Sequence, residues 1–585
     1  MNRRTLRDFL KVRLWLSEKL RSVELQITLF WAGVVGFLGG MASILFRHAL
    51  EGVQFLLTRK EGSLALLGDQ FPPWERFLLP TVGGLLAGVA LHFGTRLLKH
   101  QSSTDYMEAV SLGDGVIRTR PTLVKSLSSL FTIASGGSIG REGPMVQLSA
   151  MLASLLGRSC RFTKPRLRLL VACGAAAGIA SAYNAPIAGA LFVAEIVLGS
   201  IAMESFGPLV FASVVAALTV RHVFNGGPVF RVPEFQLVSN WEIAPYLLLG
   251  IAAGFLAPAF LELLERSERL FARIPVNAVL RLTLGGAVVG LLSFLGTGIW
   301  GGGYDVVNAM LNLNTVWQSV LVILVLKLLA TAATTGSGAV GGVFTPTLFV
   351  GAALGFLCGT PFHAAWPALI ASPSAYALVG MGCFLAATTH APLMAIIMIF
   401  ELTFDREIIL PLMLACVTAY YVSQSVRRTS IYADVLRRKQ AALPDFSIAD
   451  MRVRDLVREH PLAVGERARF NEVAQAFVSN RQNYLYVTDP EKRFRGAISL
   501  HDIKSYLNEP DLAQCVIALD LLREDFPTLT PELSLADALD RFAAHDGERL
   551  PVVAAAENPV LLGTLSKSDL LLTLAHAPRA KEEGE

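Results

Sequence analysis

Residues 135–144 read SGGSIGREGP and residues 337–346 read SGAVGGVFTP, so one glycine-rich approach to a proline occurs twice, 202 residues apart. A second motif repeats in step with it. Asn-Ala-Pro at 184–186 and His-Ala-Pro at 390–392 are each followed by a glutamate, at an offset of 206. Chance similarity between glycine-rich helices is the alternative, but two motifs recurring in order favour a duplicated unit of about 200 residues.

The composition places this duplication in a membrane. Hydrophobic residues make up 53% of the 585 and charged residues 17%, against about 25% in soluble domains, which argues against a soluble enzyme. Apolar stretches of about 20 residues, long enough to span a bilayer, occur at 26–47, 77–95, 243–261, 278–296 and 317–335. Glycine and proline interrupt the segments around the repeats. In lipid such breaks persist only where irregular backbone is buried or lines a cavity.

The first glycine-rich motif has the features of an anion site. Its glycines allow the backbone to bend, and Pro144 suits the first turn of a new helix. Free N–H groups and the positive end of the helix dipole attract an anion there. Residues 341–346 would supply a second helix N-terminus. Two such ends would hold a dehydrated halide without a full positive charge, which would bind it too tightly to conduct. Helix packing alone would explain the glycines, but not Arg141 and Glu142.

Glu142 is the residue that this pattern singles out, because an ionisable group in a membrane segment is costly and predicts a function. Its carboxylate would occupy the anion site as a tethered competitor and leave when protonated or displaced. Gating by pH and by anion concentration would follow. The alternatives are that Glu142 pairs with Arg141 or caps a helix N-terminus. For Glu195 and Glu401, a structural contact and a transport role are equally plausible.

These motifs resemble the CLC family of chloride channels and proton-coupled anion exchangers. GREGP at 140–144 and Gly-x-Phe-x-Pro at 342–346 match two of the family's three anion-site signatures, and order and spacing agree over about residues 26–440. The resemblance implies an all-α polytopic membrane fold with inverted repeats of interrupted helices. It also implies a homodimer that moves chloride and other small monovalent anions through a pathway in each subunit, gated by Glu142. The implied anion contacts are Ser102, Ser103, Gly140, Arg141, Gly143, Val343, Phe344 and Tyr432.

Two departures from the family pattern bear on mechanism. The third signature, GSGIP, is replaced by QSSTDYME at 101–108, so either Ser102 or Ser103 takes the place of its anion-binding serine. The stretch TDYMEA resembles a bacterial subgroup of voltage-gated chloride channels. Ile196 stands where many exchangers carry a proton-relaying glutamate, and a hydrocarbon cannot carry a proton.

We therefore favour passive, channel-like conduction over the alternatives. One alternative is a proton-coupled chloride antiporter that uses another route, such as a water chain or Glu195. A second, from another class, is a sensor that binds anions and signals through the C-terminal domain without transporting them. A membrane enzyme is not predicted, because no cluster of metal ligands or nucleophiles is evident in the sequence.

The C-terminal segment has a different composition and its own repeat. Residues 428–585 hold 45 of the 98 charged residues, which predicts a soluble domain. Gly-x-hydrophobic-Ser-x-x-Asp occurs at 496–502 and 563–569, after helix-like and strand-like segments. This α+β pattern resembles a tandem pair of CBS domains, which often bind adenine nucleotides. The implied ribose or phosphate contacts are Ser499, Asp502, Ser566 and Asp569. Ser and Asp before a helix are also ordinary N-caps, and we favour that interpretation slightly.

The predicted organisation follows from these boundaries. It comprises an amphipathic cytoplasmic helix (1–25), an anion transport domain (26–440, with repeats at about 26–225 and 243–440), a linker (441–450), CBS domains at about 451–508 and 518–577, and a charged tail (578–585). The basic N-terminus and the soluble tail suit the cytoplasmic side of a cell (inner) membrane. A net charge of +4 without a basic stripe gives little support for nucleic acid as a partner. The six cysteines lie far apart and predict no metal site, and no cofactor is required beyond the nucleotide just considered.

Overall fold

The structure is a computed structural model that describes most of the chain. The described residues are 3–97, 105–224, 230, 238–405, 407–433, 451–458, 461–479, 484–500, 503, 516–543, 545, 548–555 and 557–570; side chains are described from residue 26, except at 97, 224, 240, 478, 479 and 543. They form two compact units, Met1–Leu436 and Arg437–Glu585. The predicted site residues Ser102, Ser103 and Asp502 lie outside the described residues.

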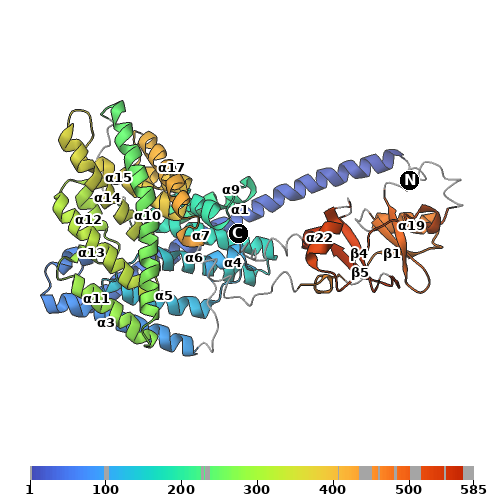
Figure 1. Cartoon of the computed structure of the whole chain (residues 1–585), viewed down its shortest axis with the longest axis horizontal. Helices are drawn as coiled ribbons and strands as arrows, with labels where there is room; N and C mark the ends of the chain where they lie inside the picture. Colours follow the sequence, from blue (N-terminus) through green and yellow to red (C-terminus); the bar gives the residue numbers. More distant parts are fainter. Residues whose placement is uncertain are drawn as a thin grey trace, which may run out of the picture. The chain divides into compact units, whose positions relative to one another are not determined.

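Helices dominate the first unit (Figure 1). The first half contains α1 (Arg3–Thr58), α2 (Leu64–Gly68), α3 (Pro73–Leu97), α4 (Tyr106–Ser111), α5 (Thr119–Ala134), α6 (Glu142–Ser159), α7 (Lys164–Tyr183), α8 (Pro186–Phe192), a π-helical turn η1 (Val193–Val197) and α9 (Met203–Phe224). The second half contains a short 3-10 turn η2 (Asn240–Glu242), α10 (Ile243–Ala272), α11 (Ala278–Leu292), a second 3-10 turn η3 (Thr297–Ile299), α12 (Tyr304–Leu311), α13 (Trp317–Gly336), α14 (Phe344–Ala365), α15 (Pro373–Thr389), α16 (Pro392–Thr403) and α17 (Ile409–Val426).

Seven helices in the described part are long and apolar enough to cross a membrane. They are Gln26–Thr58, Pro73–Arg96, Met203–Val223, Ile243–Ala272, Trp317–Gly336, Phe344–Ala365 and Ile409–Val426. Four of the five predicted apolar stretches fall on these helices, and the fifth falls on the shorter α11. The prediction of a helical polytopic membrane protein is confirmed.

The two repeated motifs adopt the same backbone conformations in each half. Gly136 and Gly338 both have positive φ, 101° and 92°, where the chain turns out of a helix. Asn184 and His390 both have φ of 56° and end α7 and α15. A left-handed residue after a helix followed by Pro at the start of the next breaks the helix sharply. The interruptions predicted from glycine and proline are therefore present at equivalent positions of the two halves.

The halves meet through these interruptions. The N–H of Gly140 donates to the carbonyl of Gly342 at 2.7 Å, and the N–H of Gly342 donates back to Gly140 at 3.0 Å. This two-residue bridge is antiparallel. Equivalent segments that pair antiparallel run in opposite directions, as inverted repeats require. The pairing places the starts of α6 and α14 beside each other.

Two glutamates join the halves a second time. Glu401, near the end of α16, accepts from the N–H groups of Ile187 (2.9 Å) and Ala188 (2.8 Å) in the first turn of α8. Glu195 accepts from Leu393 (3.3 Å) and Met394 (2.8 Å) in the first turn of α16. Each carboxylate thus satisfies the open N–H groups of the other half's short helix. The sequence left a structural contact and a transport role open for these glutamates. In the structure both glutamates make the structural contact, as helix caps.

Other glycines in the first unit serve close helix packing. α14 packs along α15, and Gly351 faces Gly380 so closely that a Cβ on either would meet the other's carbonyl oxygen. Small residues of this kind allow membrane helices to approach each other. Close packing through glycine therefore also occurs on helix faces outside the repeated motifs.

The second unit contains two small α/β layers, one from each copy of its repeat. The first has β1 (Ala463–Gly465), α19 (Phe470–Ser479), β2 (Tyr484–Thr488) and β3 (Phe494–Ser499), with β1 parallel and β3 antiparallel to β2. The second has α22 (Leu535–Ala543) and the antiparallel pair β4 (Arg549–Val553) and β5 (Leu561–Ser566), after a short helix α21 (Ala518–Leu521). Tyr484 pairs with Ser499 and Arg549 with Ser566, so the two hairpins have equivalent registers.

The reciprocal caps generate a stability prediction. Replacing Glu195 or Glu401 by Gln leaves one acceptor oxygen for two N–H groups and removes the charge, so each variant should lose about 2 kcal/mol, the worth of a hydrogen bond to a charged group. Thermal unfolding in detergent measures this. The control is Glu262→Gln, which alters an exposed i,i+4 pair with Arg266. An unchanged melting temperature in both Glu195→Gln and Glu401→Gln would contradict the capping role.

Candidate anion-binding site

Two helix N-termini converge where the halves pair. Arg141 precedes α6 and Val343 precedes α14, and neither side chain caps its own helix. The approach is close: a Cβ on Gly143 would lie 3.0 Å from the nitrogen of Gly342. The predicted meeting of two helix ends is therefore present, and glycine is required for it. The ends of both helix dipoles direct partial positive charge to this point.

The Glu142 side chain fills the space between these ends. Its Oε1 accepts from the N–H of Thr345 at 3.0 Å and its Oε2 from the Thr345 hydroxyl at 2.9 Å. The side chain is 4% exposed. A Cβ on Gly140 or Gly342 would collide with the carboxyl group, so these two glycines leave the room that it occupies. Glu142 thus caps the helix of the opposite half.

Arg141 is directed away from this carboxylate. Its guanidinium carbon lies 5.3 Å from the centre of the Tyr304 ring, a cation–π distance. Within the described part of the chain no ion pair joins Arg141 to Glu142. Pairing of the two neighbours, one of the alternatives from the sequence, is therefore wrong. Glu142 as a helix cap and Glu142 as a tethered competitor of the anion are two interpretations of the same contact. The N–H group of Thr345 that it caps is one to which an anion would otherwise bind.

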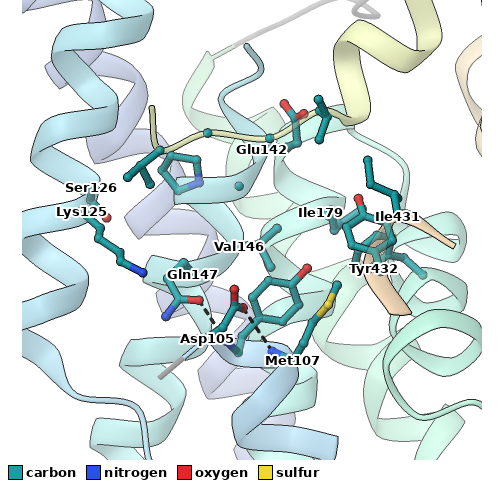
Figure 2. A pocket seen from close by; sticks show the side chains of 18 residues that line it. Asp105, Met107, Lys125, Ser126, Glu142, Val146, Gln147, Ile179, Ile431 and Tyr432 are labelled. Carbon is teal, nitrogen blue, oxygen red and sulfur yellow. Dashed lines mark hydrogen bonds between the residues drawn. The ribbon is translucent and has the colours of Figure 1, made fainter. Parts of the chain in front are cut away.

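A cavity of about 240 Å³ begins at Glu142. Figure 2 shows Glu142 at its upper end, Asp105 and Met107 at its lower end, Lys125 on one side and Tyr432 on the other. Gly143, Val343 and Tyr432, all predicted as anion contacts, line it as well. Gly143 and Tyr432 are about 290 residues apart in the sequence, and the fold brings them to one cavity.

The other predicted residues lie around this cavity. The Phe344 ring packs against Tyr183, with centroids 5.0 Å apart, and against Phe192 at 6.2 Å. Phe192 in turn lies 5.5 Å from Tyr432. Gly140 belongs to the bridge between the halves. This aromatic row gives the cavity an apolar side next to its polar upper end.

The lower end contains residues that the sequence analysis missed. Asp105 caps the short helix α4 by accepting from the N–H of Met107 at 3.3 Å, and Gln147 of α6 accepts from the N–H of Tyr106 at 3.0 Å. The first N–H groups of α4 therefore already have protein acceptors. An Asp directly before a helix is an N-cap signal that was available in the stretch 101–108.

A second cavity, of about 520 Å³, lies next to Arg141. Its lining combines basic, acidic and hydroxyl groups; among them are Arg47, Glu51, Arg141, Arg221, Tyr304 and Asp305. Glu51 and Arg221 are exposed. Tyr304 was also missed, and its only sequence signal is its place after the glycines 301–303 at the start of a helix.

Lys327 fixes one wall of this cavity. Its side chain is fully buried, and Nζ donates to the carbonyls of Ile299 (2.8 Å) and Gly301 (2.6 Å). Gly301 lines the cavity and Tyr304 follows it within three residues. A buried ammonium group needs hydrogen-bond acceptors. Here the acceptors are carbonyl groups of the segment that leads into α12.

In the second unit the predicted nucleotide contacts take part in protein contacts. The Ser566 hydroxyl accepts from the N–H of Asp569 at 3.0 Å, as an N-cap does. Asp569 Oδ1 accepts from Arg458 at 2.9 Å. Ser499 ends β3. The capping interpretation fits Ser566, and nucleotide binding stays a prediction.

Comparison with known proteins identifies the family. The model of the voltage gated chloride channel family matches residues 83–424, and the CBS domain model matches 453–509 and 517–576. A ClcB-like chloride channel protein from Ralstonia nicotianae is 52% identical over 413 residues, covering 70% of this chain and 96% of the relative. The voltage-gated ClC-type chloride channel ClcB of Citrobacter koseri is 41% identical over 406 residues, covering 68% and 97%.

Solved structures agree on the fold. A slow cyanobacterial Cl⁻/H⁺ antiporter matches with a TM-score of 0.64 and 26% identity, covering 71% of this chain and 98% of that one. A eukaryotic CLC transporter matches with a TM-score of 0.62 and 18% identity, covering 93% and 98%. The second likeness concerns the fold alone. With the paired helix ends, the inverted repeats and these matches together, the chain belongs to the CLC family of chloride channels and transporters and carries a C-terminal pair of CBS domains.

Proposed function

We propose that this protein conducts chloride and similar small monovalent anions passively, through a pathway in each subunit that Glu142 gates. The observation that carries the proposal is the contact between the Glu142 carboxylate and the N–H and hydroxyl of Thr345. An anion that binds to this helix end must first displace the carboxylate. Protonation would weaken the carboxylate as an acceptor and favour its departure, so pH and anion concentration act on one equilibrium.

The anion contacts that we propose are the groups around this contact. They are Gly140, Arg141, Gly143, Val343, Phe344 and Tyr432, with Ser102 or Ser103 from outside the described residues. Backbone N–H groups and a phenol hydroxyl are neutral donors, which suits binding weak enough to permit conduction.

Passive conduction is supported by the residues at the end of η1. Ile196 is a hydrocarbon that packs against the apolar core, and the carboxylate beside it, Glu195, is occupied in capping α16. Neither is placed as a mobile proton carrier. The alternative is proton-coupled antiport by another route, which the similarity to a Cl⁻/H⁺ antiporter of 26% identity keeps open.

We further propose the assembly and location that the family resemblance implies. The protein would be a homodimer in the cell (inner) membrane, with its N-terminus and CBS domains in the cytoplasm. The basic residues among 1–25 support this orientation through the positive-inside rule. Exposed apolar side chains on α9 and α17, including Phe211, Leu218, Leu410 and Tyr421, are suited to a subunit partner or to lipid.

The gating proposal predicts that Glu142→Gln abolishes the pH dependence of chloride flux. Gln is neutral at every pH, as a protonated Glu is, so the gate should stay in its acid state. Chloride efflux from liposomes with a potassium shunt, measured from about pH 4 to about pH 8 to span carboxyl titration, tests this. Glu262→Gln, an exposed carboxylate change on α10, is the control. A wild-type pH profile in Glu142→Gln would refute the gating role.

The same liposomes separate the competing functions. External pH is recorded with chloride efflux, under a chloride gradient and no proton gradient. Chloride efflux that requires the shunt and moves no protons is the expected result. Uphill proton movement would establish the antiporter alternative. Halide binding without any flux would favour the anion sensor that signals through the CBS domains.

Nucleotide regulation is a separate proposal for the CBS domains. It rests on the repeated Ser and Asp at the ends of β3 and β5. We expect AMP, ADP or ATP to bind the full-length protein in calorimetry, and Asp569→Ala to weaken binding about tenfold by removing a charge-assisted hydrogen bond. Ser566→Ala serves as the comparison for an effect through folding alone. Loss of this N-cap should lower the free energy of unfolding by about 1 kcal/mol. If none of the three nucleotides binds, the site is purely structural.

A further inference from the structure

The Thr345 hydroxyl is the centre of a cluster of three side-chain hydrogen bonds. Its Oγ1 lies 2.9 Å from Glu142 Oε2, 2.8 Å from the Tyr183 hydroxyl and 3.1 Å from the Tyr304 hydroxyl. Thr345 and Tyr183 are 2% and 1% exposed. Glu142 is therefore connected, through one hydroxyl, to two tyrosines from different elements, α7 and α12.

The donor directions in this cluster follow from counting protons. A hydroxyl has one proton and two lone pairs, and an ionised carboxylate only accepts. Thr345 must therefore donate its proton to Glu142 and accept from both tyrosines. With Tyr304 as donor to Thr345, its own oxygen still has lone pairs for a donor from the second cavity. The order Tyr304, Thr345, Glu142 is a continuous line of O–H donors that ends at the gate.

The two tyrosines differ in what they reach. Tyr304 lines the second cavity, whose lining includes the exposed, charged Glu51 and Arg221. Charged side chains of this kind mark an aqueous face of a membrane protein. Tyr183 is buried and Glu142 borders the first cavity. Tyr304 is thus the member of the cluster that borders the second cavity.

The charges around the cluster favour transfer through hydroxyls over a free hydronium ion. On the second cavity's side they are Arg47 and Glu51 of α1, Arg141, Arg221 of α9 and Asp305 of α12. On the first cavity's side they are Asp105, Lys125 of α5 and the phenols Tyr106 and Tyr432. Arginines outnumber carboxylates by three to two in the first group, and Arg141 lies directly on the Tyr304 ring. A hydronium ion that moved past Arg141 as far as Glu142 would be repelled, whereas hydroxyl groups pass a proton over this stretch without an ion crossing it.

We propose that Tyr304 and Thr345 form a proton relay between the second cavity and Glu142. A hydronium ion in the cavity gives a proton to Tyr304 Oη and becomes water, as the phenol proton passes to Thr345 Oγ1 and the Thr345 proton passes to Glu142 Oε2. Three O–H bonds form and three break, and one proton moves from hydronium to the carboxylate. Release follows the reverse order. This inference rests on the proposed gating role of Glu142 and names the positioning residues that serve it.

The test compares Tyr304→Phe with Tyr183→Phe, which remove one hydroxyl each from the same partner. Chloride current is followed in patches of proteoliposome membrane after a rapid step from about pH 7 to about pH 4, across the carboxyl range. We expect Tyr304→Phe to slow the response at least about tenfold, as loss of a proton-transfer group does, with the steady-state pH profile unchanged. Tyr183→Phe should respond at the wild-type rate, although its bond is the shorter one. The slowing should occur only for steps applied at one membrane face.

A second pair of variants tests the relay without altering Tyr304. Thr345→Ser keeps the hydroxyl and should respond within about twofold of wild type, whereas Thr345→Val should be as slow as Tyr304→Phe. A merely structural cluster would make Tyr183→Phe as defective as Tyr304→Phe, and would shift the steady-state profile in both.

Failure of the relay and failure of the gate give different results. If Glu142→Gln abolishes the pH response while Tyr304→Phe and Thr345→Val respond at the wild-type rate, the relay is overturned and the gate stands. If Glu142→Gln keeps the wild-type pH response, the gating role itself is wrong and the relay falls with it.

Discussion

The backbone pairing of Gly140 with Gly342 is the constraint on which the rest of the site depends. It holds the starts of α6 and α14 together at a distance that no Cβ at Gly143 would allow without displacing its neighbours. Two helix N-termini that face one point repel each other, because both present partial positive charge. Negative charge at this point is needed to offset the repulsion. Glu142 supplies this negative charge. When its carboxylate leaves, the two helix ends lose that charge, so its departure is favoured when an anion enters in its place.

The duplication kept the backbone and changed the side chains, and this asymmetry makes a gate possible. The offset of 202 places Arg141 opposite Val343, Glu142 opposite Phe344 and Gly143 opposite Thr345. One half therefore supplies the carboxylate, and the other supplies an aromatic wall and the N–H and hydroxyl that bind it. Elsewhere the symmetry was kept, since Glu195 and Glu401 cap each other's helices with the same geometry. Symmetric contacts stabilise the fold, whereas the asymmetric contact is the one that we propose an anion replaces.

The sequence predicted the architecture because its signals are local. Glycine before proline, apolar stretches of spanning length and repeats at a fixed offset all report on nearby backbone, and the interrupted helices appear at those places. Residues of the site were predicted where they lay in a repeated motif, as Glu142, Val343 and Phe344 do, and Tyr432 was predicted through the family resemblance alone. Thr345 lies in the same motif, but its importance depends on Glu142 203 residues away and on Tyr183 162 residues away. Gln147 was missed for the same reason, because its partner Tyr106 lies 41 residues away. Asp105 was missed although its N-cap signal is local, and the role of Glu195 was left open because its partners belong to the other half.

The placement of full charges suits a site that, as proposed, binds an anion and still releases it. The donors at the centre are the neutral groups of Thr345, while Lys125 borders the first cavity, and Arg47, Arg141 and Arg221 border the second. Cations at the cavities raise the local anion concentration, and neutral dipoles at the centre replace hydration without holding the ion tightly. In the proposed gate Glu142 competes for those same dipoles, so its hydrogen bonds to Thr345 would set both the affinity for an anion and the ease of opening. A change that strengthens the carboxylate's contact would then weaken anion binding, and gating and conduction could not be tuned separately at this position.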